Sequence, residues 1–222
     1  MMKSLKDKYC IVGIGETRFG KLPELSSLAL AYEAGKRAIE DAGLTNSEID
    51  GVLAQQPYLN PAMMYSLWIS EGLGITPKYS TDLNIGGATP ISMVEHAIMA
   101  IETGLCKTVL CVFAEDGATG FRIPNHGRPR FGTEDFERPF GRYIPPGLFA
   151  LYARRHMHEY GTTPEQLASV SVKNRRHGSI NPIAQFKDPI TIDDVLNAPM
   201  ICDPLTRLNC CPIGDGAAAV IL

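Results

Sequence analysis

Short apolar segments alternate with helix-like segments over the first half of this chain of 222 residues. A short apolar run is typical of a buried strand, whereas apolar residues three and four positions apart are typical of a helix. Their alternation predicts βαβ units, an α/β fold with a mainly parallel sheet, and right-handed crossovers. The expected strands are residues 9–14, 49–54, 79–85 and 108–114, and the expected helices are residues 26–42, 61–73 and 90–103.

The end of the sequence predicts one more core element. A turn with two glycines, Gly214 and Gly216, precedes the small and apolar run at residues 217–222. Glycine permits backbone conformations that other residues resist, which suits a tight turn. The run after it predicts a strand, or a strand–helix junction, that is buried on both faces.

The composition and the periodicity of the sequence change after Glu115. Residues 117–146 are rich in Gly, Pro, Arg and Phe and show little periodicity. A long irregular stretch inside a compact domain is often functional or faces a partner. Two helices are expected after it, at residues 147–160 and 164–177, and Thr162 with Glu165 forms a capping-box pattern before the second.

Composition excludes several classes of function. The net charge of −3 implies no general attraction to nucleic acid or to an anionic membrane. No apolar run is long enough for a transmembrane helix, and the first eight residues contain no apolar signal region, so a cytoplasmic location is the default expectation.

The six cysteines predict neither a zinc site nor a disulfide framework. No Cys-x-x-Cys pair occurs, and His156 and His158 are two positions apart, so they do not share a helix face. No metal is therefore expected. The adjacent Cys210 and Cys211 are either packing residues or a redox pair.

Several separated segments resemble one family. Residues 11–21 look like the first strand of sterol-carrier-protein-type thiolases and their lipid-transfer relatives, and residues 152–157 and 172–177 look like helices of the loop domain of that group. Residues 211–219 are similar to the closing strand of the first half of the thiolase fold, where a Cys-Pro-x-x-Asp-Gly-Ala-Ala-Ala pattern occurs. The resemblance implies that Asp215 fixes a turn and does not react.

The resemblance also implies an architecture. It is a thiolase-like, layered αβα half-fold with a mainly parallel mixed sheet and an inserted loop domain. Residues 1–116 would form the N-terminal core, residues 117–200 the loop-domain excursion between neighbouring core strands, and residues 201–222 the closing strand of the core. In such proteins an equally long second half follows. Its Gly-His-Pro and Cys-x-Gly motifs do not occur in this sequence.

The candidate site is the Gly-Gly turn between the strand at 79–85 and the helix at 90–103. A helix N-terminus presents backbone N–H groups and favours negative charge. The resemblance places the acyl-accepting cysteine of thiolases at Gly87, so no thiolate nucleophile is available there and the catalytic residue is unknown. Two interpretations stay open: the turn binds a thioester carbonyl or enolate through its N–H groups, or it is a tight turn without a reaction. The candidate substrate-binding residues at the turn, expected to line a pocket, are Gly86, Gly87, Ala88 and Thr89.

Other candidates surround this site in the sequence. Arg122, Arg128 and Arg130 would contact the phosphates of CoA, or they belong to a solvated loop or a subunit contact. Tyr143 would shape an acyl tunnel or donate a proton, or it packs in a core.

Two further groups have alternative roles. His96 either supports the site or packs on its helix. Glu115 and Asp116 follow a buried strand, at the end of a βαβ unit where ligands bind, or they are ordinary strand-end acids.

The function that the resemblance implies is a thiolase-like enzyme, or its N-terminal half, acting on the C–C bond β to a CoA thioester. Retro-aldol chemistry is favoured because Gly87 replaces the cysteine. The alternatives are an acetyl-CoA acetyltransferase-type thiolase and a non-catalytic subunit that binds acyl-CoA or lipid. No bound cofactor is expected, and acyl-CoA is the expected substrate.

The expected partners follow from the half-fold. A homodimer or higher oligomer is expected, with contacts from residues 81–85 and 90–103, because a half-fold leaves an apolar helix layer uncovered. A second chain that supplies the C-terminal thiolase half and a small OB-fold protein are further candidate partners.

Overall fold

The computed structural model describes residues 5–59, 61–120, 134–140 and 145–222. It contains two compact units, Met1–Arg128 with Ile213–Leu222 and Pro129–Pro212. The first unit carries the candidate turn. The expected division into residues 1–116, 117–200 and 201–222 stays a prediction.

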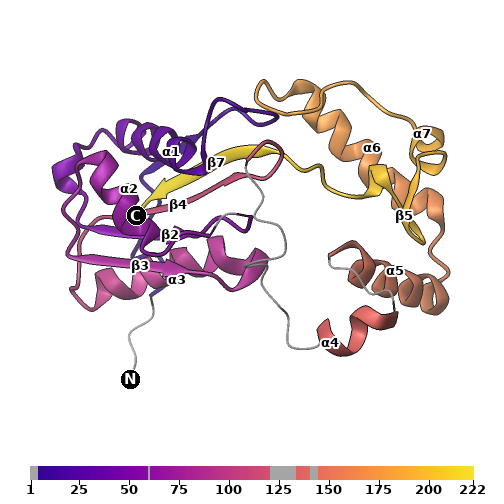
Figure 1. Ribbon diagram of the computed structural model, residues 1–222, viewed down its shortest axis with the longest axis horizontal. Helices are drawn as coiled ribbons and strands as arrows, with labels where there is room; N and C mark the ends of the chain where they lie inside the picture. Colours follow the sequence, from indigo (N-terminus) through magenta and orange to yellow (C-terminus); the bar gives the residue numbers. More distant parts are fainter. Residues whose placement is uncertain (1–4, 60, 121–133, 141–144) are drawn as a thin grey trace. The chain divides into compact units, whose positions relative to one another are not determined.

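A five-stranded mixed sheet forms the centre of the first unit (Figure 1). Its order is β1-β7-β4-β2-β3, and β7 is antiparallel to both of its neighbours while β2 is parallel to β4 and to β3. All strands except β7 therefore run in one direction, which confirms the mainly parallel mixed sheet. The strand bounds are Gly13–Glu16 for β1, Gly51–Gln55 for β2, Tyr79–Leu83 for β3, Val109–Asp116 for β4 and Asp215–Ile221 for β7.

Helices cover both faces of this sheet. Helix α1 (Ser27–Asp41) packs against β1, β7 and β4, and α2 (Tyr65–Leu73) packs against β2 and β3. Helix α3 (Thr89–Glu102) packs against β2, β3 and β4, and Figure 1 shows α1 and α3 on opposite sides of the sheet. The result is the αβα layering that the sequence predicts.

Local chemistry sets the helix ends. The Ser26 hydroxyl accepts a hydrogen bond from the backbone N–H of Ala29 and caps α1. Pro90 lies in the first turn of α3, where a missing N–H has no consequence, and α2 ends at Gly74 in the left-handed region.

Strand β1 packs directly on the backbone of α1. A Cβ atom on Gly15 would lie 2.1 Å from the carbonyl oxygen of Ala34 and 2.5 Å from the nitrogen of Ala38. Only glycine allows this approach. The strand that the sequence predicts at residues 9–14 begins at Gly13, because that is where pairing with β7 begins.

The closing strand is buried on one face only. Ala217, Ala219 and Ile221 are buried in the core with α1, whereas Ala218 is exposed and Val220 is half-buried. The prediction that this run is buried on both faces is wrong for the described part of the chain. Successive residues of β7 point to opposite faces of the sheet. On the face of Ala218 and Val220, the covering helix α3 packs on β2, β3 and β4.

Strands β4 and β7 are hydrogen-bonded neighbours, with Ala114 opposite Ala217. The chain therefore leaves the sheet after one strand and returns in the adjacent one. The long segment between them thus connects neighbouring strands of the core, and the expected loop domain stays a prediction. The role of that excursion at an acyl entrance stays a prediction.

The second unit is mainly helical. Its elements are α4 (Glu134–Glu137), α5 (Pro146–Tyr160), α6 (Pro164–Ile180), α7 (Ile192–Leu196) and an antiparallel pair of β5 (Met200–Cys202) and β6 (Leu205–Thr206). The capping box of α6 uses Thr163 and Gln166, so the predicted pairing of Thr162 with Glu165 is wrong by one residue.

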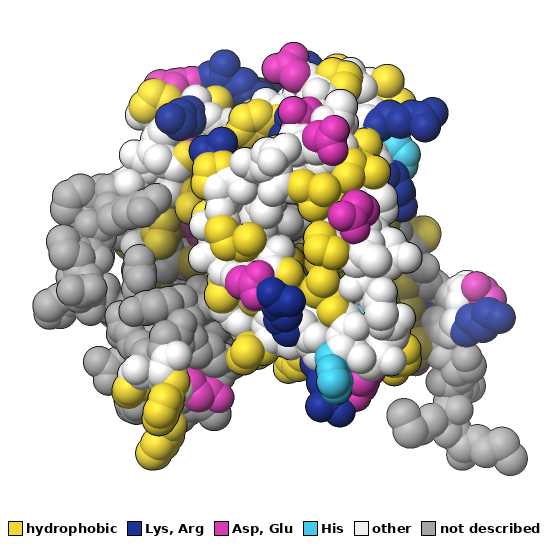
Figure 2. Space-filling view, turned by 90° about the vertical axis from the view of Figure 1, so that its right-hand side faces the viewer, with side chains coloured by type: hydrophobic (Ala, Val, Ile, Leu, Met, Phe, Trp, Pro, Cys, Tyr) yellow, Lys and Arg dark blue, Asp and Glu magenta, His cyan; other side chains and the backbone are white. Residues whose placement is uncertain are grey.

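The described surface carries mixed charges. On the face shown in Figure 2, basic, acidic and apolar side chains are interspersed. Within the described residues, no helix has the length and apolar character needed to cross a membrane.

Candidate functional site

The Gly-Gly turn is a short 3-10 segment, Gly86–Ala88, between β3 and α3. The buried Thr89 hydroxyl accepts a hydrogen bond of 2.9 Å from the N–H of Ile85 and donates one of 2.6 Å to the carbonyl oxygen of Gly86. The Thr89 side chain thus links the two ends of the turn by hydrogen bonds. The turn is preorganised by the first residue of the helix that it precedes.

The backbone conformation requires glycine at only one of the two glycine positions of the turn. Gly86 has a φ of +79°, a left-handed conformation that disfavours other residues. Gly87 has no such φ, and a Cβ atom built on it would meet no atom of the described residues within 4 Å. Neither backbone strain nor crowding therefore requires glycine at position 87. The missing side chain leaves open space at the N-terminus of α3.

The backbone of the turn leads into the N-terminus of α3. Gly87 and Ala88 stand at the start of the helical segment, where N–H groups have no acceptor within the helix. Both residues are exposed in this chain. The pocket expected around Gly87, and the substrate-binding roles of Gly86, Gly87, Ala88 and Thr89, stay predictions. The arrangement is suited to hold a negatively charged or polarised oxygen.

Polar residues end the neighbouring strands at the same edge of the sheet. Glu115, near the end of β4, accepts a hydrogen bond of 2.6 Å from the N–H of Tyr58, whose ring packs edge-on against Phe113. Burial raises the pKa of Glu115, the hydrogen bonds from the backbone of Tyr58 and Leu59 oppose the rise, and the charge of Asp116 adds to it.

Asp82 at the end of β3 has a structural role. Its carboxylate accepts hydrogen bonds of 2.9 and 2.7 Å from the N–H groups of Tyr65 and Ser66, at the first turn of α2. A carboxylate at this position satisfies N–H groups that have no helical partner. Asp82 thus anchors α2 to the sheet.

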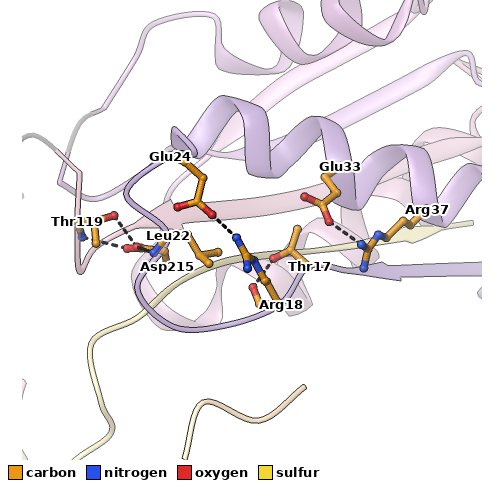
Figure 3. Close-up of polar contacts among 8 residues, drawn as sticks. All are labelled: Thr17, Arg18, Leu22, Glu24, Glu33, Arg37, Thr119 and Asp215. Atoms are coloured by element: carbon orange, nitrogen blue, oxygen red, sulfur yellow. Dashed lines mark hydrogen bonds and ion pairs between the residues drawn. The ribbon is translucent and has the colours of Figure 1, made fainter. Parts of the chain in front are cut away.

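Asp215 fixes turns, as the resemblance implied (Figure 3). One carboxylate oxygen accepts hydrogen bonds from the N–H of Leu22 at 2.7 Å and the hydroxyl of Thr119 at 2.6 Å, and the other accepts from the N–H of Ala118 at 2.7 Å. Asp215 is 1% exposed. Because all these donors belong to loops of the first unit, Asp215 is a structural residue.

The two buried cysteines of the first unit do not replace the missing thiol. Cys106 and Cys111 are buried in the core beneath α3, and the Cys111 thiol lies 3.8 Å from the carbonyl oxygen of Met93. Burial raises the pKa of Cys111 to about 12 and also raises that of Cys106. Both thiols stay protonated near neutral pH, so neither is a nucleophile.

Other candidates from the sequence lie away from the turn or outside the described residues. The ring nitrogen Nδ1 of His96 contacts the carbonyl oxygen of Ser92, one turn earlier in α3, so His96 packs on its own helix. Within the described residues, no group of three or more His, Cys, Asp or Glu side chains is arranged to hold a metal ion. Four candidates lie outside the described residues: Arg122, Arg128, Arg130 and Tyr143.

Sequence reasoning missed Gln55. It ends β2 and is 1% exposed, although glutamine is rarely buried. The signal was present, because Gln55 and Gln56 directly follow the apolar run of the predicted strand. Its neighbours became evident only from the order of the strands.

Comparisons with known proteins identify the class. The model of the N-terminal domain of thiolase matches residues 9–222, so this chain belongs to the thiolase family. The resemblance found in the sequence is confirmed.

Individual relatives differ in their activities. The chain is 38% identical over 216 residues to an acetyl-CoA acetyltransferase of Methanothermobacter thermautotrophicus, covering 96% of this chain and 56% of that protein. It is 35% identical over 230 residues to a steroid side-chain-cleaving aldolase of Thermomonospora curvata, covering 100% of this chain and 58% of that protein. The chain thus spans little more than half the length of either relative.

A solved structure of an Ltp2–ChsH2(DUF35) aldolase is also similar. It has a TM-score of 0.83 and 35% identity, over 95% of this chain and 54% of that chain. The aldolase branch of the family is therefore among the relatives of this chain, and the solved aldolase is a complex with a DUF35 partner protein.

Proposed function

We propose that this protein belongs to an enzyme that cleaves the C–C bond β to a CoA thioester by retro-aldol chemistry. The observation that carries the proposal is Gly87, at the position where the family resemblance places the acyl-accepting cysteine of thiolases. Its conformation does not require glycine. The geometry of the turn therefore does not explain why position 87 lacks a thiol, and we attribute this to the reaction that the site carries out.

From this turn, retro-aldol cleavage needs only the backbone N–H groups that the turn retains, and not a thiol. The reaction converts a β-hydroxyacyl thioester into a carbonyl compound and a shorter acyl thioester, and it passes through an enolate. It needs donors for the enolate oxygen and no thiolate nucleophile. The N–H groups at the start of α3 are such donors. The substrate class is therefore β-hydroxyacyl-CoA, and we propose no bound cofactor.

The relatives support this proposal and one alternative. The steroid side-chain-cleaving aldolase shares 35% identity with the chain. The 38% identity to an acetyl-CoA acetyltransferase favours the alternative, an acyltransferase. That alternative needs a nucleophile from outside the turn.

Product analysis separates the two activities. The purified protein, with any chain that copurifies, is incubated with a β-hydroxyacyl-CoA in the absence of free CoA and, separately, with a 3-ketoacyl-CoA plus free CoA. Retro-aldol activity yields a carbonyl product and a shorter acyl-CoA in the first mixture. Turnover confined to the second mixture would overturn the proposal, and turnover in neither would favour a binding subunit.

Gly87→Cys provides a matched chemical control. The open space at Gly87 accommodates the side chain, and the helix N-terminus lowers the pKa of a thiol placed there. We expect peptide mass analysis to find acyl transfer to position 87 in this variant, with Gly87→Ala as the variant without a thiol. An unreactive thiol at position 87 would argue against an acyl-binding turn.

We also propose that the assembly contains more than this chain. Strand β3 is an edge strand of the sheet, and all of its residues are half-buried. Ile91 and Met99 on α3 are 72% and 48% exposed, and Ile85 before the turn is 60% exposed. An open strand edge beside exposed apolar side chains suits a two-fold contact.

Three partners fit the proposal: a second copy, a chain that supplies the C-terminal thiolase half, and a small OB-fold protein. Light scattering together with intact mass of the native protein distinguishes them. A stable monomer at micromolar concentration without a second chain would contradict all three. A cytoplasmic location stays a proposal that cell fractionation tests.

A further inference from the structure

Four buried polar atoms have no hydrogen-bond partner among the described residues: Gln55 Oε1, Tyr65 Oη, Glu115 Oε1 and Asp116 Oδ1. Buried polar groups are nearly always paired in native proteins, so each exception has a reason. The face of the sheet on which each residue lies divides the four into two pairs; for Gln55, Glu115 and Asp116 the alternation of side chains along the strands sets this face.

Gln55 and Glu115 lie on the α3 face of the sheet. Leu53, two residues before Gln55, and Cys111, four residues before Glu115, belong to the core cluster beneath α3. Tyr65 and Asp116 lie on the other face, because Tyr65 and Ala114 belong to the core beneath α1 and α2. Only the first pair shares a face with the helix that starts at the candidate turn.

Strand order brings Gln55 and Glu115 together at the edge that carries this turn. Gln55 is opposite Phe113 in β4, and Glu115 is two residues further along the same face. A strand spacing of about 4.8 Å and two rises of about 3.3 Å along the strand place such diagonal neighbours about 8 Å apart, within reach of long side chains. On its other side Gln55 is opposite Leu83, and the chain reaches Gly86 three residues after Leu83.

The free carboxyl oxygen of Glu115 is held in place. The other oxygen, Oε2, accepts the 2.6 Å hydrogen bond from the N–H of Tyr58. Glu115 as a residue is half-buried and Gln55 is 1% exposed, but the Oε1 atoms of both side chains are buried. Burial raises the pKa of Glu115.

We propose that Gln55 and Glu115 bind the hydroxyl group of a β-hydroxyacyl chain whose thioester lies at the Gly86–Thr89 turn, and that they select hydroxylated over non-hydroxylated thioesters. The substrate class rests on the function proposed above. A β-hydroxyl and its thioester oxygen are separated by three carbon atoms. Neighbouring strands are about 4.8 Å apart, so adjacent strand ends hold both groups.

Binding measurements test the selection. Calorimetry compares a β-hydroxyacyl-CoA with the acyl-CoA of the same length that lacks the hydroxyl. Native protein is expected to bind the hydroxylated compound at least about tenfold more tightly, since a buried polar partner is left unpaired by the other compound. Gln55→Met removes the acceptor at similar size, and Glu115→Gln replaces Oε1 by a donor while the remaining oxygen still accepts from Tyr58.

Both variants are expected to lose most of that preference and to bind the non-hydroxylated compound as the native protein does. Gln56→Met is the matched control, because Gln56 follows Gln55 on the opposite face of the sheet, where its amide contacts Asp82. Thermal unfolding of each variant checks that it folds. If the variant at one of the two positions fails to fold, the variant at the other position decides the test.

The outcomes separate this inference from the proposed function. Equal binding of the two compounds by native protein, or unchanged preference in a folded variant, overturns the hydroxyl site and leaves water as the partner of these atoms. Selective binding without cleavage overturns retro-aldol activity and leaves the hydroxyl site standing.

Discussion

The hydroxyl of Thr119 donates a 2.6 Å hydrogen bond to Oδ2 of the buried Asp215. This contact joins the turn after β4 to the start of β7. The same oxygen accepts from the N–H of Leu22, in the segment that precedes α1. One carboxylate therefore closes three loops at the edge of the sheet that also carries Glu115, the end of β3 and the Gly-Gly turn.

Asp215→Asn is expected to lower the free energy of unfolding by about 2–4 kcal/mol, because an amide offers one acceptor where the carboxylate satisfies several buried donors. Urea unfolding measures the change. Asp41→Asn is the matched control: the exposed Asp41 carboxylate accepts a single hydrogen bond, from the N–H of Ile14. The free energy of unfolding of Asp41→Asn is expected to fall by about 1 kcal/mol or less. Equal losses would contradict the assigned role of Asp215.

The effect of Asp215 is expected to depend on pH. Burial raises the pKa of Asp215, but the hydrogen bonds from Thr119, Leu22 and Ala118 outweigh burial and lower the pKa below its usual value. A carboxyl group with a lowered folded-state pKa stabilises the protein above its unfolded pKa of about 4, and this stabilisation is lost as the pH falls. The stability difference between native protein and Asp215→Asn should therefore narrow as the pH falls below about 5. A constant difference would refute the assignment.

The two glycines of the candidate turn should respond differently to alanine. Gly86→Ala places a side chain at a φ of +79°, and we expect a loss of about 1–2 kcal/mol. The Cβ atom of Gly87→Ala meets no described atom within 4 Å, so this variant should be neutral or stabilised by about 0.4–1 kcal/mol, because alanine restricts the unfolded chain. Each variant is the control for the other in chemical denaturation. A larger loss at Gly87 would show that this glycine is structural.

Gly15→Ala is expected to disrupt the contact between β1 and α1. Its Cβ atom would lie 2.1 Å from the carbonyl oxygen of Ala34, and this backbone atom moves only with the helix. We expect a loss of about 3 kcal/mol, at the upper end for overpacking. Ile14→Val, at a neighbouring side chain that is 59% exposed, should change stability by less than about 1 kcal/mol. Comparable losses in thermal unfolding would contradict the close packing of β1.

Sequence periodicity predicted the helices closely. The expected helices at residues 26–42 and 90–103 correspond to Ser27–Asp41 and Thr89–Glu102. Helix ends are set by local capping and by the 3.6-residue pattern, both of which are visible in a single sequence. The burial of β7 was predicted less well, because the exposure of Ala218 depends on which strands α3 covers.

The sequence by itself determined the chemistry of the turn: Gly87 carries no thiol, Pro90 starts a helix, and the order strand, glycines and helix aims N–H groups at one place. These are local properties of adjacent residues. Only the tertiary structure decided that Gln55 and Glu115 share a face beside that turn, because their meeting depends on strand order and parallel register between segments 60 residues apart in the chain. The same holds for Asp215, whose donors come from loops that pairing of β7 with β4 and β1 brings together.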